Sequence, residues 1–141
     1  MLDASVVANL LFGDEGAQDI GRWIFDNLST AIVSDIAWGE TVGALGIRVR
    51  RGDADAAEAK SVLDEFSNDV ASWARSGIIS QDIAVATGYV GDFSLPLRFV
   101  DAIHVAVARR LDATVITTDR QQFRAARKLG VSAINPLEQP T

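Results

Sequence analysis

The sequence lacks several features, and each absence narrows its chemistry. It has no cysteine among its 141 residues, which excludes disulfide bonds and thiolate metal sites. No apolar run approaches the roughly 20 residues that a transmembrane helix needs. The opening residues, MLDASVVANLLFGDE, carry acids where a secretory signal peptide carries basic residues. We therefore expect one cytoplasmic domain over residues 1–141, with no membrane association.

Positive charge is scarce overall but unevenly placed. The net charge of −6 argues against a simple nucleic-acid-binding protein, because such proteins usually have a basic surface. Residues 98–128 nevertheless form a locally positive stretch that contains only three acids. Its basic residues are Arg98, Arg109, Arg110, Arg120, Arg124, Arg127 and Lys128. This stretch is either a set of solvated helix faces or a local anion-binding surface, and the sequence leaves both open.

Segments with helical and strand-like patterns alternate along the chain. Helices are predicted over 4–13, 15–28, 35–52, 53–73, 81–93, 98–110 and 120–130, with Asp53 as a possible cap. Strands are predicted over 1–3, 31–34, 77–80, 114–119 and 131–136. Such alternation predicts an α/β protein with a parallel sheet covered on both faces. The tail after about residue 136 is expected to fray.

Four acids stand out by their positions. Asp3 and Asp119 end predicted strands, at the sheet edge where ligands of parallel α/β proteins bind. Glu40 and Asp101 lie on helix faces that are otherwise apolar, and His104 follows Asp101 by three residues. Burial of a lone carboxylate costs several kcal/mol unless a partner compensates it. These positions therefore suggest a binding or catalytic site.

Each acid also has a simpler structural interpretation. Asp119 could cap the last helix, and Asp3 could belong to a turn. Asp101 lies in the first turn of its helix, where the helix dipole favours an anion. Glu40 could pair with an arginine, either Arg48 or Arg98.

Considered together, the four carboxylates point to a cation. At an effective dielectric constant of about 20, two like charges about 4 Å apart repel by roughly 4 kcal/mol. Carboxylate oxygens without cysteine favour Mg²⁺ or Mn²⁺. His104 is interpreted as a packed, hydrogen-bonded core residue that could orient Asp101, with metal ligation as the alternative.

Four segments in order resemble the PIN domain family: LDASVVANLL, SDIAWGETVGAL, FVDAIHVAVAR and VITTDRQQF. The resemblance spans almost the whole chain and is strongest for the toxins of VapBC-type toxin–antitoxin modules. It implies a three-layer α/β/α fold with a central, mainly parallel sheet. It also implies RNA cleavage with Mg²⁺ or Mn²⁺ held by acids. At the matching positions, these acids are Asp3, Glu40, Asp101 and Asp119.

The resemblance implies roles for neighbouring side chains as well. Ser5 matches a small hydroxyl residue that supports the acidic cluster or touches phosphate, and Thr117 and Thr118 could act similarly. We add Arg98 and His104 to this set as substrate-binding or supporting residues. These side chains would surround the four acids.

The resemblance further implies partners and products. Such toxins are usually homodimers, silenced by a cognate antitoxin whose tail covers the acidic groove, often with an arginine reaching in. RNA would be cut to leave a 3′-hydroxyl and a 5′-phosphate. Two departures stand out: only two residues precede Asp3, and Arg120, Gln121 and Gln122 stand where many relatives carry a further acid. The sequence leaves open the number of metals, the RNA target and the oligomeric state.

Other chemistries fit less well. A haloacid dehalogenase-type phosphatase needs a second aspartate where Ser5 stands and a lysine at a strand end, and a receiver domain needs that lysine too. No G-x-G-x-x-G follows the first strand, and no G-x-S-x-G supports a serine hydrolase. The remaining alternatives are a PIN-fold RNA-processing nuclease outside toxin–antitoxin systems and a non-catalytic PIN-fold binding module.

Overall fold

A parallel sheet lies at the centre of the protein. The computed structural model describes residues 1–138. Leu2 pairs in parallel with both Val33 and Ile116, so it joins two pairs of short strands into the order β2–β1–Leu2–β3–β4. The strands are β1 (Ile32–Ser34), β2 (Ala74–Ser76), β3 (Val115–Ile116) and β4 (Ala133–Ile134). The predicted first strand is therefore reduced to one paired residue.

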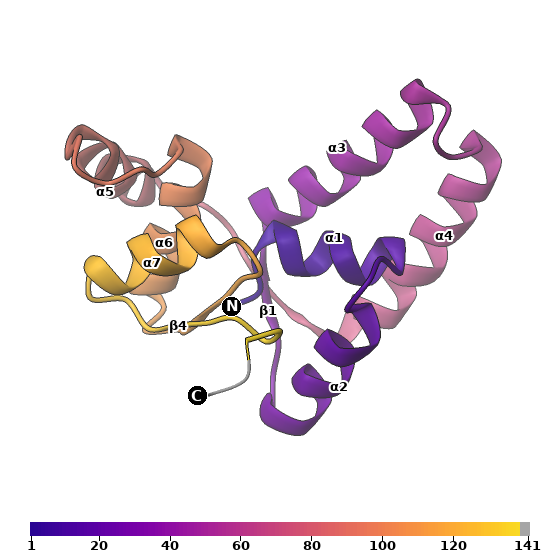
Figure 1. Ribbon diagram of the computed structural model, residues 1–141, viewed down its shortest axis with the longest axis horizontal. Coiled ribbons are helices and arrows are strands. Elements are labelled where there is room, and N and C mark those ends of the chain that lie inside the picture. The colour runs from indigo at the N-terminus through magenta and orange to yellow at the C-terminus, as the bar shows by residue number, and fades with distance from the viewer. Residues whose placement is uncertain (139–141) are drawn as a thin grey trace.

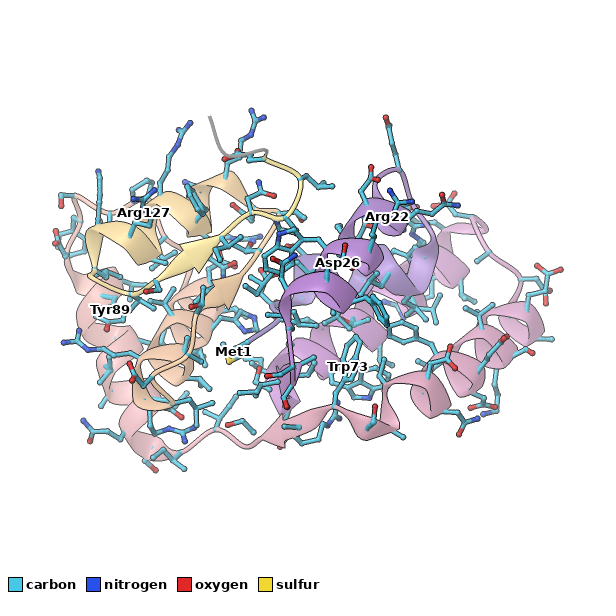
Figure 2. The ribbon with its side chains drawn as sticks, turned by 90° about the horizontal axis from the view of Figure 1, so that it is seen from below. Met1, Arg22, Asp26, Trp73, Tyr89 and Arg127 are labelled. Carbon is cyan, nitrogen blue, oxygen red and sulfur yellow. The ribbon has the colours of Figure 1, made fainter. Side chains whose placement is uncertain are left out.

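Helices lie on both sides of these strands. They are α1 (Ala4–Phe12), α2 (Ala17–Asn27), α3 (Asp35–Arg51), α4 (Ala56–Asp69), α5 (Ser80–Gly91), α6 (Phe99–Arg110) and α7 (Arg120–Lys128), with a 3₁₀ turn η1 (Val70–Ser72). Figure 1 shows α5, α6 and α7 on one side of β1, and α1, α2, α3 and α4 on the other. Met1 lies between the two groups (Figure 2). This arrangement confirms the predicted α/β fold with a parallel sheet between helices.

The start of α4 differs from the prediction. Gly52 ends α3 with a φ of 79°, a left-handed conformation that glycine adopts at little cost. The N–H of Asp53 still donates to the carbonyl of Arg48, so Asp53 belongs to the turn. Asp55 is the N-cap instead, and its carboxylate accepts two backbone N–H groups. The predicted cap at Asp53 is therefore wrong by two residues.

The predicted strands at 77–80 and 114–119 are also altered. In place of the strand at 77–80, the structure has β2 at Ala74–Ser76. The Asp82 carboxylate accepts the N–H of Ile79, so α5 begins at Ser80, within the predicted strand. The second pairs as β3 over two residues only. Beyond β3, the N–H groups of Thr118 and Asp119 bond to side-chain hydroxyls in place of a neighbouring strand. Polar side chains therefore end both segments.

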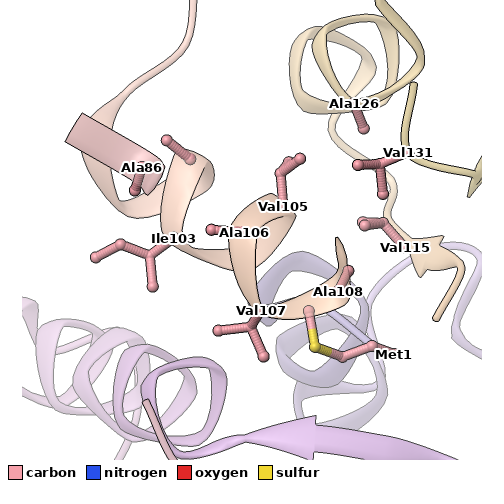
Figure 3. Close-up of a cluster of buried hydrophobic side chains, with 11 residues drawn as sticks. Met1, Ala86, Ile103, Val105, Ala106, Val107, Ala108, Val115, Ala126 and Val131 are labelled. Carbon is pink, nitrogen blue, oxygen red and sulfur yellow. The ribbon is translucent and has the colours of Figure 1, made fainter. Parts of the chain in front are cut away.

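Helix α6 forms the centre of one hydrophobic core. Its residues 102–108 are all buried, which explains the apolar run in the sequence. Met1, Val115 and Val131 pack against it from the sheet side, and Ala86 packs from α5 (Figure 3). Because α6 is fixed on several sides, Asp101 and His104 are carried on one of the best-packed elements of the chain.

The chain remains attached to the domain up to the end of the described part. The N–H of Leu137 donates to the side chain of Asn135, and Glu138 lies 3.3 Å from Arg120. The rest of the tail predicted to fray, residues 139–141, lies outside the described residues. Within residues 1–138, no helix has the length and apolar character needed to cross a bilayer.

Candidate active site

The predicted acids are delivered by four different elements. Asp3 follows Leu2 and is the N-cap of α1, and Asp119 follows β3 and is the N-cap of α7. Asp101 lies in the first turn of α6, and Glu40 lies within α3. Because Leu2 and β3 are parallel neighbours, the acids that follow them emerge at the same edge of the sheet.

Asp3 is a buried carboxylate surrounded by neutral donors. The residue is 4% exposed, and its oxygens accept from Ser5 Oγ at 2.7 Å, Thr117 Oγ1 at 3.0 Å and the N–H of Val6 at 3.2 Å. In residues 1–138 no lysine or arginine forms an ion pair with it. Burial raises the pKa of Asp3, and the hydrogen bonds and the nearby His104 only partly oppose this. Asp3 is thus built into a polar socket that lacks a cationic partner.

A chain of hydroxyls connects Asp3 with the segment that leads to Asp119. Ser5 Oγ accepts from both the N–H and the Oγ1 of Thr118, at 3.0 and 2.9 Å. Thr117 Oγ1 accepts from the N–H of Asp119 at 3.0 Å. Ser5, Thr117 and Thr118 therefore link chain segments more than 110 residues apart. This network holds Asp3 and Asp119 in a fixed relative position.

Arg98 lies against two of the acids. Its Nε and Nη2 donate to the two carboxylate oxygens of Asp101 at 2.7 and 3.1 Å, and Nη2 lies 3.8 Å from Asp119. Asp119 also accepts two backbone N–H groups, so the predicted helix cap is confirmed. The hydrogen bonds to Asp101 raise the pKa of Arg98. The Arg98 side chain is 77% exposed, so this cation lies at the surface of the site.

Glu40 pairs with His104. Its Oε2 lies 2.7 Å from His104 Nε2, and the alternative pairing with Arg48 or Arg98 is not found among the described residues. Arg48 instead contacts Asp14. The Glu40 side chain is 37% exposed, more than its apolar helix neighbours suggest, because neighbours such as Ile47 are themselves exposed. His104 is buried as predicted, but the acid that it contacts is Glu40 and not Asp101.

These contacts connect the four acids through an arginine, a set of hydroxyls and a histidine. Arg98 contacts Asp101 and Asp119, whereas Asp3 is tied to the Asp119 segment by hydroxyls. Glu40 is connected through His104, whose charge also acts on the pKa of Asp3. In the part of the chain that the structure describes, no three acid or histidine side chains converge as a metal site.

The donor set nevertheless fits a hard divalent cation. It consists of carboxylates, with hydroxyls as their supports and no sulfur ligand. The guanidinium of Arg98 is the cation that now lies between Asp101 and Asp119. A metal held by Asp101 and Asp119 would compete with this guanidinium for their carboxylates.

Sequence reasoning missed Gln122. This residue of α7 is 1% exposed, its Nε2 donates to the carbonyl of Asp101 at 3.4 Å, and its N–H donates to Asp119. Its Oε1 is buried with no hydrogen-bond partner among the described residues. The sequence RQQF offered no signal for this burial, because Gln121 and Gln122 look equivalent there.

Comparison with known proteins now identifies the family. The sequence model of the PIN domain matches residues 1–129, so the chain belongs to the PIN domain family. None of the proteins with curated descriptions matches it.

Several solved structures share the fold. FitAcB from Neisseria gonorrhoeae superposes with a TM-score of 0.76 at 18% identity, covering 98% of both chains. A toxin–antitoxin complex from Klebsiella pneumoniae superposes with a TM-score of 0.68 at 14% identity, with 98% of both chains covered. VapC20 of Mycobacterium tuberculosis, described as a sarcin-ricin loop cleaving toxin, gives 0.65 at 15% identity and covers 92% of this chain and 94% of its own. At such identities the likeness establishes the fold.

Proposed function

We propose that the protein is a metal-dependent endoribonuclease and the toxin of a type II toxin–antitoxin module. The observation that carries this proposal is Asp3, a buried carboxylate that hydroxyls orient and no arginine or lysine of the described chain neutralises. Membership of the PIN family and the likeness to a ribonucleolytic toxin support the reaction class. The likeness to a toxin–antitoxin complex supports an antitoxin as partner.

Asp3, Glu40, Asp101 and Asp119 would hold Mg²⁺ or Mn²⁺. When bound, the ion supplies a water of lowered pKa and stabilises the charge that develops on the phosphate. The chain's own side chains prepare the acids for this role. Ser5 and Thr117 fix both oxygens of Asp3, and His104 fixes one oxygen of Glu40.

Arg98 would exchange partners during binding. Its guanidinium neutralises Asp101 and approaches Asp119 in the free protein. Once displaced from these carboxylates, it is free to bind two oxygens of an RNA phosphate in the same forked geometry. We further propose that the protein acts in the cytoplasm as a homodimer, and that an antitoxin tail with its own cation covers the acids.

The test is cleavage of a mixed RNA pool in the presence of Mn²⁺ or Mg²⁺, with EDTA as a control. Asp119→Asn removes a charge from the site, and Asn serves nearly as well as Asp at an N-cap. Asp55→Asn is the matched control, because Asp55 also caps a helix but lies outside the site. We expect cleavage by the wild type and Asp55→Asn alone. Cleavage that persists in EDTA or in Asp119→Asn would contradict the proposal.

A further inference from the structure

A groove lies beside the acidic site, along the outer face of α7. It has a volume of about 630 Å³. Its lining includes the apolar side chains of Pro96 and Phe123 and four cations, which are Arg120, Arg124, Arg127 and Lys128. The cations recur at intervals of three and four residues, so they share one face of the helix. Arg127 lies on the outer side of α7 (Figure 2).

The charge of this helix contrasts with that of the chain. Helix α7 has four basic residues and no acidic one, within a protein of net charge −6. Arg120 lies 3.3 Å from Glu138, and the charge of Lys128 acts on Asp92. Among residues 1–138, no acid lies within ion-pair distance of Arg124 or Arg127. The groove therefore keeps an excess of positive charge.

The helix dipole does not account for this arrangement. Cations in the last turn of a helix are favourable, which explains Arg127 and Lys128. Arg120 is the first residue of α7 and Arg124 lies in its middle, where the dipole gives no such benefit. Arg124 and Arg127 are exposed and have no acidic partner among the described residues, so they are available to an external anion.

The groove begins at the acidic site. Asp119 caps the helix whose next residue, Arg120, lines the groove. Pro96 lines it from the other side and lies two residues before Arg98, which contacts Asp101. From Arg120 to Lys128 the helix rises by about 12 Å. A chain lying along this face would therefore lead directly to the acids.

We propose that this groove binds the sugar–phosphate backbone of single-stranded RNA next to the phosphodiester that is cut. The inference rests on the proposed function, because it names where that substrate lies. The four cations match the regular negative charge of the RNA backbone. The guanidinium of Arg127 lies 5.6 Å from the ring centre of Phe123, so a cation and an aromatic ring share the groove, as in known single-strand sites.

The test measures RNA binding in EDTA, so that catalysis is not required. The double variant Arg124→Gln/Arg127→Gln removes two groove cations. Its control, Arg50→Gln/Arg51→Gln, removes two exposed cations from the last turn of α3. The affinity of a fluorescent single-stranded RNA is measured by anisotropy between about 50 and about 200 mM salt. Circular dichroism verifies that both variants are folded.

We expect the groove variant to bind RNA about tenfold more weakly at low salt. The negative slope of log K against log salt should become shallower by about 1.4. The control should keep the wild-type affinity and slope. Equal behaviour of the two variants would overturn the inference and leave the proposed nuclease intact if the wild type still cleaves RNA. Wild-type protein that neither binds nor cleaves RNA would overturn both. If the groove variant kept its RNA affinity but bound poly-glutamate more weakly than the wild type does, the groove would be a site for an acidic peptide. That result would overturn the inference.

Discussion

Two aspartates of this protein expose almost no surface, yet their surroundings are opposite. Asp82 is 2% exposed and lies in a fork formed by Arg110, whose Nε and Nη2 donate to its two oxygens at 2.8 and 3.0 Å. Asp3 is 4% exposed and accepts from two hydroxyls and one backbone N–H. One carboxylate has a cationic partner, and the other has none among residues 1–138.

The pKa values follow this difference. Burial alone would raise the pKa of Asp82, but the hydrogen bonds from Arg110 and from the N–H of Ile79, with the charge of Arg110, outweigh it and lower that pKa. Burial dominates at Asp3 and raises its pKa. Asp82 therefore belongs to a structural ion pair, whereas we propose that Asp3 binds a cation from outside.

The largest expected effect concerns catalysis. Asp3→Asn should reduce the rate of RNA cleavage by about 10²–10³-fold, because it removes a charge that stabilises the transition state through the metal. Asp82→Asn should leave the rate per folded molecule unchanged. Single-turnover cleavage of one RNA by both variants measures this difference. A similar loss of cleavage rate in the two variants would contradict the view that Asp3 is functional and Asp82 structural.

The second effect concerns stability without metal. Asp82→Asn should lower the free energy of unfolding by about 2 kcal/mol, because it leaves the partly exposed Arg110 without its charge partner. Asp3→Asn should not lower it, because Asn also serves as an N-cap and no cation loses its partner. Urea unfolding in EDTA measures both values. Clear destabilisation by Asp3→Asn would instead favour a structural role for Asp3.

The third effect is an opposite dependence on pH. The raised pKa of folded Asp3 means that its contribution to stability falls as the pH rises above 3.8 and through that pKa. The lowered pKa of Asp82 means that its contribution is present above 3.8 and is lost as the pH falls through the folded value. Urea unfolding between about pH 3 and about pH 7 tests this. The deficit of Asp82→Asn should shrink in acid, whereas Asp3→Asn should gain on the wild type as the pH rises.

The smallest effect concerns Arg98, whose side chain is largely exposed although that of Asp101 is not. Arg98→Gln should change the free energy of unfolding by less than about 1 kcal/mol and strengthen Mn²⁺ binding by about twofold to fivefold, because the metal no longer displaces a cation. Lys60→Gln removes a cation from the exposed pair with Asp64 and is the control. Isothermal titration in metal-free buffer compares them. Weaker Mn²⁺ binding by Arg98→Gln would show that Arg98 supports the metal.

The alternation of helices and strands was predictable, and so were the positions of Asp3, Asp101 and Asp119. Helical periodicity and strand-to-helix junctions are local properties that a sequence displays. The exact strands were less predictable, because the hydroxyls of Ser5 and Thr117 that end the pairing beyond β3 act across the fold. Residues 77–80 look like a strand by composition, but Asp82 begins a helix there.

The partners of the acids were the least predictable part of the site. An arginine was one possible partner of Glu40, but Glu40 contacts His104, which follows it by 64 residues. The burial of Gln122 beside Asp101 could not be predicted from the sequence. Gln121 and Gln122 have the same side chain, and only the packing of α7 decides which of them faces the core. Spacing within a helix predicts which residues share a face, but it does not predict which helix meets that face.

The most direct test of this account is the binding of Mn²⁺ measured by isothermal titration, with wild type, Asp3→Asn and Asp55→Asn compared. Both substitutions replace an N-cap aspartate, and Asp3 alone belongs to the acidic cluster. The account predicts equal binding by the wild type and Asp55→Asn, and binding at least about tenfold weaker by Asp3→Asn. Mn²⁺ binding by Asp3→Asn as tight as that of Asp55→Asn would contradict the claim that Asp3 is kept for a metal.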